Sequence, residues 1–205
     1  MERTTRKEQA TETREKLLEA AKTLFAERGY DGTPVREINK QIGKGDGILY
    51  HYFPGGKREI LSVLLQESMV RRKYELQIAT QSIEELKLRD ALLTFSRRFY
   101  EVFMADIDIL RIMVRVSDLL DLEQQEEFSD MIKKQTELFA QFLRRREQKG
   151  EIRTLNYIMA TRQFIAMIMQ ILITELGIVK IQWEEDTETY LEQIVDYTFE
   201  LWRKP

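Results

Sequence analysis

The sequence contains no cysteine, and its 205 residues include a single histidine, three prolines and nine glycines. Without cysteine there is no disulfide or thiolate metal ligand, and one histidine excludes a zinc site built from several imidazoles. Metal chemistry would have to rest on carboxylates alone, so we expect neither a metal nor a cofactor. No phosphate-cradling glycine loop is present either, because Gly45-Asp46-Gly47 is too short. We therefore expect a protein that is not an enzyme.

The sequence begins with charged rather than apolar residues, since Met1 is followed by Glu2, Arg3 and Arg6. A secretory signal needs an apolar segment here, so we expect none and place the protein in the cytoplasm. The net charge of -3 is unevenly spread. Residues 1–60 hold 12 Lys/Arg and 10 Asp/Glu, whereas the remaining 145 residues hold 20 and 25. The small basic excess therefore lies at the N-terminal end, which favours a nucleic-acid contact there.

An amphipathic helix is predicted before residue 29. Thr11 and Thr13 are both plausible N-caps, and Gly29 is expected to end the helix. Its apolar residues recur at steps of 1, 4, 7 and 8, which is typical of a core-facing helical stripe. They are Leu17, Leu18, Ala21, Leu24 and Phe25.

Residues 33–53 are predicted to form two short helices joined by a glycine turn, which is the layout of a helix-turn-helix. Thr33 is the expected N-cap of the first helix, with Pro34 at its first position and Gly43 at its end. Gly45 is the expected N-cap of the second helix. A fourth helix is predicted to begin near Lys57 and to bury Ile60, Leu61, Leu64, Leu65 and Met69. This layout makes a DNA-binding protein the leading hypothesis.

Residues 12–65 resemble the DNA-binding domain of TetR-family transcriptional repressors. The matching elements are Leu17-Leu18-Glu19-Ala20-Ala21, Leu24-Phe25, Gly29-Tyr30, Thr33, Ile38, Gly43, Gly47, Leu49-Tyr50, Tyr52-Phe53, Lys57 and Leu61. The resemblance implies an all-α protein, with a three-helix helix-turn-helix DNA-binding domain over residues 11–71. It also implies a larger helical domain over residues 72–205 that dimerises and binds a small molecule, which releases the DNA. The sequence departs from the family pattern at Asn39, Ile42, Lys44 and Gly45.

The candidate DNA-binding residues fall into two groups. A reading helix lies in the major groove with residues near its N-terminus facing base edges. The candidates for base or groove contact are Lys44, Asp46, Gly47 and His51, and those for phosphate contact, by resemblance, are Thr33, Tyr50, Tyr52 and Lys57. Other interpretations remain open: Thr33 is only a cap, Lys57 or His51 is merely solvated, and at least one of the two tyrosines packs against its own domain.

Beyond residue 70 the sequence is predicted to be helical throughout, because only Gly150 and Gly177 interrupt it before the final Pro205. Three apolar stripes, over residues 92–103, 109–120 and 128–142, predict amphipathic helices able to surround a cavity. The candidate ligand-binding residues are Phe95, Phe99, Phe103, Met113, Arg115, Met131, Gln135, Phe164 and Met167. Arg115 would orient an acidic ligand group or, equally well, pair with Asp118 or Asp121.

The last two predicted helices differ from the others in their apolar content. Residues 164–173 are apolar almost all round, which requires cover on every side. Ten residues are too few to span a bilayer, so we expect no membrane contact. Together with the helix over residues 190–202, this segment is expected to form a four-helix homodimer interface. A two-fold dimer would read a roughly palindromic double-stranded operator.

The sequence thus favours a DNA-binding transcriptional regulator, acting as a repressor that a small lipophilic effector releases from its operator. The alternative is a helical protein-interaction module that does not bind DNA. A single sequence identifies neither the operator nor the effector.

Overall fold

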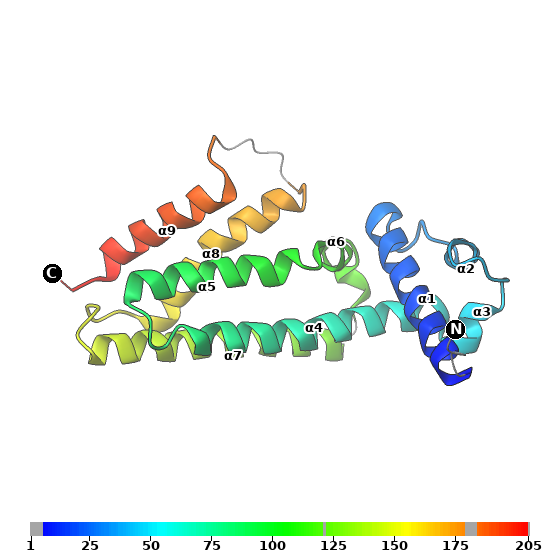
Figure 1. The fold of residues 1–205 in the computed structure, drawn as a ribbon, viewed down its shortest axis with the longest axis horizontal. Coiled ribbons are helices and arrows are strands. Elements are labelled where there is room, and N and C mark those ends of the chain that lie inside the picture. The colour runs from blue at the N-terminus through cyan, green and yellow to red at the C-terminus, as the bar shows by residue number, and fades with distance from the viewer. Residues whose placement is uncertain (1–5, 121, 179–183, 205) are drawn as a thin grey trace, which may run out of the picture. The chain divides into compact units, whose positions relative to one another are not determined.

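The computed structural model describes residues 6–120, 122–178 and 184–204, and these residues are almost entirely helical (Figure 1). One isolated backbone bridge joins Ile152 and Arg203. The α-helices are α1 (Arg6–Arg28), α2 (Val35–Gln41), α3 (Ile48–Tyr52), α4 (Gly56–Ser82), α5 (Leu88–Met104), α6 (Ile107–Arg115), α7 (Leu122–Gln148), α8 (Tyr157–Glu175) and α9 (Thr187–Trp202). A 3-10 turn over Ser117–Leu119 separates α6 from α7. The all-α prediction is confirmed.

The chain forms two compact units. The first contains the described residues of Met1–Met69 together with Ile107–Leu120, and the second those of Val70–Asp106 and Asp121–Pro205. Helix α4 contributes to both, because it runs without a break from Gly56 to Ser82. The domain ranges 11–71 and 72–205 stay a prediction. Helix α6 departs from them, since it packs against α1 in the first unit.

The core of the first unit is built from the stripes that the sequence predicted. Leu17 of α1, Ile38 of α2, Leu49 of α3 and Ile60 of α4 are completely buried in one cluster. Burying a side chain of this size contributes about 1.5–3 kcal/mol relative to leaving it exposed. Ile112 of α6 joins the same cluster, which explains why α6 belongs to this unit.

The predicted start of α1 is wrong, because the helix already contains Arg6. The Thr11 hydroxyl donates to the Lys7 carbonyl at 3.2 Å, and the Thr13 hydroxyl donates to the Gln9 carbonyl at 2.8 Å. Both hydroxyls thus bond backward within a helical turn instead of capping its end. The segment ahead of them, Lys7-Glu8-Gln9-Ala10, consists of strong helix formers that extend the helix.

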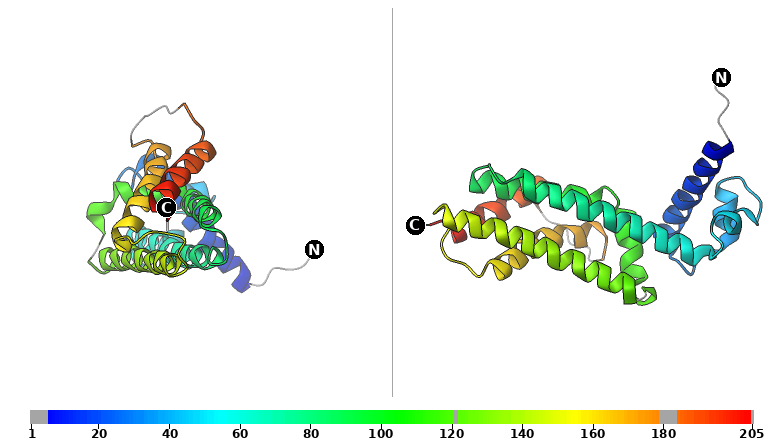
Figure 2. Two further views of the ribbon diagram at one scale, coloured as in Figure 1. Left: turned by 90° about the vertical axis from the view of Figure 1, so that its left-hand side faces the viewer. Right: turned by 90° about the horizontal axis from the view of Figure 1, so that it is seen from below.

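The second unit packs α5, α7, α8 and α9 with the C-terminal half of α4. The half of α4 that belongs to this unit and α7 run side by side in Figure 2, and Gln135 of α7 donates to the Leu76 carbonyl of α4. Phe95, Phe139, Phe164 and Trp202 form an aromatic core whose consecutive ring centroids lie 4.4–5.7 Å apart. Tilted, stacked and edge-on aromatic pairs at these distances stabilise a fold beyond their buried area.

The last two helices begin at polar caps. Asn156 accepts a hydrogen bond from the backbone of Met159 at the start of α8, and Asp186 does so from Thr189 at the start of α9. The backbone hydrogen bond from Thr189 also lowers the pKa of the Asp186 carboxyl. Such caps satisfy amide groups that a helix start otherwise leaves unpaired.

Helix α8 is the one helix among the described residues that is long and apolar enough, by length and composition, to cross a membrane. The sequence-based statement that its apolar segment is too short is therefore wrong, because the helix extends over 19 residues rather than ten. Core helices of globular proteins pass the same test. Phe164, Ile168 and Leu172 of α8 are completely buried, and the helix packs against α5, α7 and α9. The absence of membrane contact stays a prediction.

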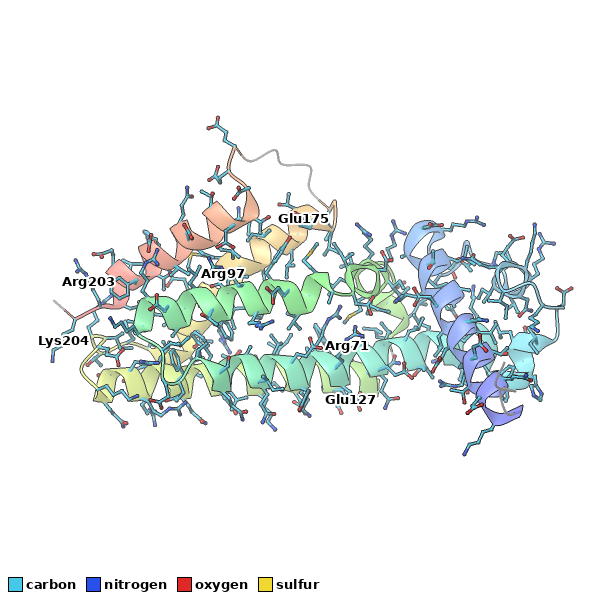
Figure 3. All side chains as sticks on the ribbon, in the orientation of Figure 1. Arg71, Arg97, Glu127, Glu175, Arg203 and Lys204 are labelled. Atoms are coloured by element: carbon cyan, nitrogen blue, oxygen red, sulfur yellow. The ribbon has the colours of Figure 1, made fainter. Side chains whose placement is uncertain are left out.

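Charged side chains project from the outer faces of the helices, and many of them form ion pairs (Figure 3). Arg97 of α5 pairs with Glu188 and, at 3.6 Å, with Glu192 of α9. Arg89 of α5 also pairs with Asp196 of α9, at 2.6 Å. These pairs are about half exposed, so each contributes at most about 1 kcal/mol.

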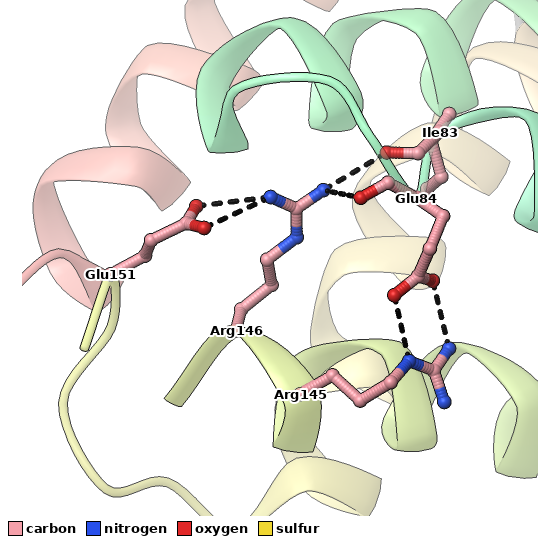
Figure 4. Close-up of polar contacts among 5 residues, drawn as sticks. All are labelled: Ile83, Glu84, Arg145, Arg146 and Glu151. Carbon is pink, nitrogen blue, oxygen red and sulfur yellow. Dashed lines mark hydrogen bonds and ion pairs between the residues drawn. The ribbon is translucent and has the colours of Figure 1, made fainter. Parts of the chain in front are cut away.

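One buried cation joins three segments of the second unit (Figure 4). The Arg146 side chain near the end of α7 is only 3% exposed. One of its terminal nitrogens donates to the Ile83 and Glu84 carbonyls at 3.0 and 2.7 Å, and the other donates to both carboxylate oxygens of Glu151 at 3.1 Å. The neighbouring Arg145 pairs with the Glu84 carboxylate at the surface, at 2.8 and 2.9 Å. Arg146 therefore fixes the residues after α4 and those after α7 to one another.

We predict that Arg146→Ala lowers the free energy of unfolding by about 3 kcal/mol, because it leaves one buried carbonyl, one partly buried carbonyl and a partly buried carboxylate without their donor. Arg145→Ala is the matched control, and its exposed pair predicts a loss below about 1 kcal/mol. Urea unfolding followed by far-UV circular dichroism measures both variants. Equal losses would contradict the structural role given to Arg146.

Candidate nucleic-acid interface and ligand cavity

The turn between α2 and α3 is built from glycine. Gly43 adopts a φ of +66°, a left-handed conformation that glycine accepts without a steric penalty. Its amide donates to the Lys40 carbonyl and the amide of Lys44 donates to the Asn39 carbonyl, both at 3.0 Å. This pair of bonds satisfies carbonyls at the end of α2 and reverses the chain toward α3.

Asn39 fixes the far side of the same turn. Its side chain is completely buried, and its amide nitrogen donates to the Asp46 carbonyl at 2.8 Å. Asn39, at which the sequence departs from the family pattern, thus stabilises the turn through this hydrogen bond. Helix α3 begins at Ile48 with Gly47 in the cap position, so the prediction that Gly45 caps it is wrong. Residues 46 and 47 form a turn instead, closed by a bond from the Ile48 amide to the Gly45 carbonyl.

The turn and α3 bring together most of the residues predicted to contact DNA. Five of them are exposed on this one segment: Lys44, Asp46, Gly47, Tyr50 and His51. Tyr50 is 53% exposed, whereas Tyr52 is half-buried against the core of the first unit. The two tyrosines therefore differ in the way the sequence suggested, with one packed and one available to a ligand.

Thr33 is placed differently from its prediction. Pro34 occupies the cap position of α2 and the helix start has no side-chain cap, so the prediction that Thr33 is the N-cap is wrong. The Thr33 side chain is completely buried, and its hydroxyl lies 2.8 Å from the Gly29 carbonyl and 3.2 Å from the Leu24 carbonyl. The hydroxyl closes the α1–α2 connection and does not face solvent.

Lys57 lies in the first turn of α4, as the sequence predicted, but its ammonium group already has a partner. The Nζ atom donates to the Tyr30 carbonyl at 2.7 Å and lies 4.1 Å from the centroid of the Tyr30 ring. Burial raises the pKa of the Tyr30 hydroxyl, so the ring stays neutral at physiological pH. An ammonium group keeps further N–H donors after one bond, so this contact orients Lys57 without using all its donors.

Two exposed basic residues of α2, Arg36 and Lys40, lie outside the set that the sequence suggested. The signal was present, because both fall between the inward positions Val35, Ile38 and Ile42 of the predicted stripe. Among the described residues, no group of three or more histidine, cysteine, aspartate or glutamate side chains is arranged to hold a metal ion.

The comparison with known families decides how this unit is classified. The profile of bacterial regulatory proteins of the tetR family matches residues 17–64, which run from α1 into α4. Residues 17–64 thus belong to the tetR family of regulatory proteins. The resemblance noted from the sequence is thereby confirmed, and the match covers the helix-turn-helix and the helices that support it.

Two curated relatives match the same part of the chain. It is 47% identical over 49 residues to the transcriptional regulator LmrA of Bacillus subtilis, which is 24% of this chain and 26% of that protein. It is 38% identical over 61 residues to the transcriptional repressor AcnR of Corynebacterium glutamicum, which is 30% of this chain and 32% of that protein. The chain thus spans about a quarter to a third of the length of these relatives.

The solved structures extend the likeness to the whole fold. The TetR-family transcriptional regulator PfmR of Thermus thermophilus matches with a TM-score of 0.69 over 90% of this chain and 97% of that one. The sequence identity is 23%, so this similarity supports the fold and not a shared ligand.

The second unit contains an apolar cavity of about 280 Å³. Nine of its 12 lining residues are apolar, and the polar ones are Gln135, Thr136 and Arg162. The walls come from α4, α5, α7 and α8, with Phe99 and Phe103 of α5 on one side. This size lies just below the usual range of small-molecule sites.

The cavity includes four of the nine residues predicted to bind a ligand: Phe99, Phe103, Met131 and Gln135. Phe95 and Phe164 are instead completely buried in the aromatic core. Met167 is half-buried and does not line this cavity. Phe95, Phe164 and Met167 thus lie outside this cavity, and ligand binding by them stays a prediction.

Met113 and Arg115 lie in the other unit, because α6 packs against α1. Met113 packs against the core of the first unit, and an Arg115 terminal nitrogen donates to the Ala26 carbonyl. The predicted pairing of Arg115 with Asp118 is not what the structure displays, and Asp121 lies outside the described residues.

We predict that Thr33→Val lowers the free energy of unfolding by about 1 kcal/mol, because it removes a buried hydroxyl that satisfies the α1–α2 connection. Thr11→Val is the control, since the Thr11 hydroxyl also bonds a helix carbonyl but is exposed, and we expect a change below about 0.5 kcal/mol. Thermal and urea unfolding measure the difference. A Thr33 variant as stable as the Thr11 variant would refute the structural role and restore Thr33 as a ligand contact.

Proposed function

We propose that this protein is a DNA-binding transcriptional regulator that acts as a repressor. The observation that carries the proposal is the exposed cluster of Lys44, Tyr50 and His51 on a helix-turn-helix whose apolar residues pack inward. The family match over residues 17–64 and the printed roles of LmrA and AcnR support it. A cytoplasmic location agrees with this function.

The proposed roles follow from the chemistry of the exposed groups. Lys44, Asp46, Gly47 and His51 would lie at the groove, where a lysine or histidine donor meets base acceptors and Gly47 lets the backbone approach. Tyr50, Tyr52 and Lys57 would donate to phosphates, which fixes the position of the helix on the duplex. Arg36 and Lys40 add positive charge beside them.

The competing proposal is a helical module that binds another protein through the same surface. A selection from random duplexes, followed by binding measurements with salt titration, separates the two. A DNA-binding protein enriches a sequence and loses affinity linearly on a log–log salt plot. Failure to retain any duplex at low salt would refute DNA binding.

The protein would bind its operator as a homodimer through α8 and α9. Both helices carry large apolar side chains that stay exposed in a single chain: Met159, Ile173, Tyr197 and Leu201. Exposed apolar residues on neighbouring helices are typical of protein–protein interfaces. A two-fold dimer reads palindromic half-sites about 34–36 Å apart.

A small lipophilic molecule bound in the cavity of the second unit would release the DNA. Phe103 lines this cavity, and the Arg72 guanidinium lies 5.3 Å from the centroid of the Phe103 ring. Arg72 also donates to the carbonyl of Asp106, the residue that precedes α6. Helix α6 packs in the unit that carries the helix-turn-helix. A shift of Phe103 that moved Arg72 and Asp106 would therefore reach that unit along the chain, through the start of α6.

We predict that Lys44→Ala reduces the log–log salt slope of DNA binding by about one unit per DNA-bound subunit, as for one lost phosphate or groove cation. Lys73→Ala is the matched control, because Lys73 is an exposed lysine of α4 that belongs to the second unit. Fluorescence anisotropy with the selected duplex measures both slopes. An unchanged slope for Lys44→Ala would remove Lys44 from the DNA contact.

We predict that the protein is a dimer at micromolar concentration by light scattering and that Tyr197→Glu makes it monomeric, because a buried unpaired carboxylate opposes association. Tyr74→Glu is the matched control, since Tyr74 of α4 is 65% exposed and Tyr197 is 58% exposed. A monomeric unaltered protein would contradict the dimer, and dissociation by Tyr74→Glu alone would place the interface elsewhere.

A further inference from the structure

Gln135 is a nearly buried polar residue of the cavity wall. It is 93% buried, and it lies on α7 among lining residues that are mostly apolar. Its side-chain nitrogen donates to the Leu76 carbonyl at 3.3 Å and to the Thr80 hydroxyl at 2.8 Å. These two bonds fix the orientation of the amide, because the reverse orientation would set its oxygen against the Leu76 carbonyl oxygen.

The amide oxygen of Gln135 is left as an acceptor. Within the described chain it accepts no hydrogen bond, and it is not among the side-chain atoms that are sealed from solvent without a partner. The oxygen is thus accessible while its residue is almost completely buried. A buried acceptor of this kind gains free energy when a ligand brings it a donor.

The other polar residues of the wall restrict the ligand further. The Thr136 hydroxyl donates to the Ile132 carbonyl at 2.8 Å, so its proton is already used. Arg162 is the charged residue of the wall, and no carboxylate of the described residues lines the cavity. A positively charged ligand would therefore meet a like charge and no counter-ion. The remaining lining residues offer only apolar surface.

We infer that the cavity binds a neutral, mostly hydrocarbon molecule that carries one hydroxyl group, and that this hydroxyl donates to the amide oxygen of Gln135. The inference rests on the proposed function only in treating this cavity as the effector site. A volume of about 280 Å³ holds roughly nine methylene-sized groups if each occupies about 30 Å³, the volume of a water molecule in the liquid. A straight-chain alcohol of eight carbons matches that size.

Two isomers test the hydroxyl directly in the unaltered protein. 1-Octanol and methyl heptyl ether contain the same atoms, but only the alcohol has a hydrogen to donate. Isothermal titration of the full chain without DNA is expected to give about five-fold tighter binding of the alcohol, as for one net hydrogen bond. Equal binding of the isomers, or no binding of either, would overturn the inference.

Charged probes of the same length test the wall as a whole. Octylammonium and octanoate are expected to bind more weakly than 1-octanol, because each would lose the hydration of its charge in an apolar cavity. Octylammonium would also meet the like charge of Arg162, and octanoate has no hydrogen to donate to Gln135. Tighter binding of octanoate would overturn the inference and indicate an anion site at Arg162.

A substitution locates the contact. Gln135→Met keeps the side-chain length but removes the acceptor, and the preference for the alcohol over the ether is expected to fall below two-fold. Gln141→Met, at an exposed position of the same helix, is the control and keeps the five-fold preference. A preference that survives Gln135→Met would overturn the assignment. If this variant does not fold, the isomer comparison in the unaltered protein still decides.

DNA binding measured on the same preparations separates this inference from the proposed function. A protein that binds DNA but does not distinguish the isomers retains the proposed function and loses the hydroxyl site. A protein that prefers the alcohol but binds no duplex retains the site and loses the regulatory role.

Discussion

A guanidinium held inside the second unit joins helix α4 to the end of α5. Arg72 of α4 is 2% exposed, and desolvation lowers its pKa to about 10, although the Asp106 carboxylate opposes that change. It remains charged at neutral pH and donates to the Asp106 carbonyl at 3.0 Å. Arg71 fixes the carboxylate of the same aspartate at 2.8 Å. Two neighbouring arginines thereby hold the connection between α5 and α6 from one helix, and truncating a buried partner of this kind costs several kcal/mol.

The sequence predicted the parts of the fold that depend on local rules. Gly29 and Gly43 end their helices with a positive φ, as expected from residues that adopt this conformation freely. The periodic apolar residues of α1 and α4 are buried as predicted. Periodicity does not specify which helix a stripe of apolar residues packs against. The stripe of α6 was correct, but its burial against α1 rather than around the cavity is a tertiary choice that no local pattern encodes.

The candidate site residues also divide into those that local sequence rules predict and those whose position depends on tertiary packing. Exposure of Lys44, Tyr50 and His51 followed from the turn and the inward positions of α3, which are local features. Thr33 was misplaced because Pro34 itself occupies the cap position, so the hydroxyl could turn back to Gly29 and Leu24. In the cavity, Phe99 and Phe103 line the wall while Phe95 does not, because one helix turn separates the aromatic core from the cavity surface. Sequence alone gives these three phenylalanines the same face.

The proposed apolar effector would act through the free energy that burial of its hydrocarbon supplies. Burying a methylene contributes about 0.8 kcal/mol, so eight carbons supply several kcal/mol before the entropic cost of binding is subtracted. Only the part that differs between the DNA-bound and released states shifts the equilibrium, and about 5.5 kcal/mol inverts a population from 1:99 to 99:1. The stack of Phe103 on Arg72 is where that difference can arise, because the ring is shared by the cavity wall and the cation that holds Asp106. A ligand that filled the cavity without displacing this ring would bind and leave the affinity for DNA unchanged.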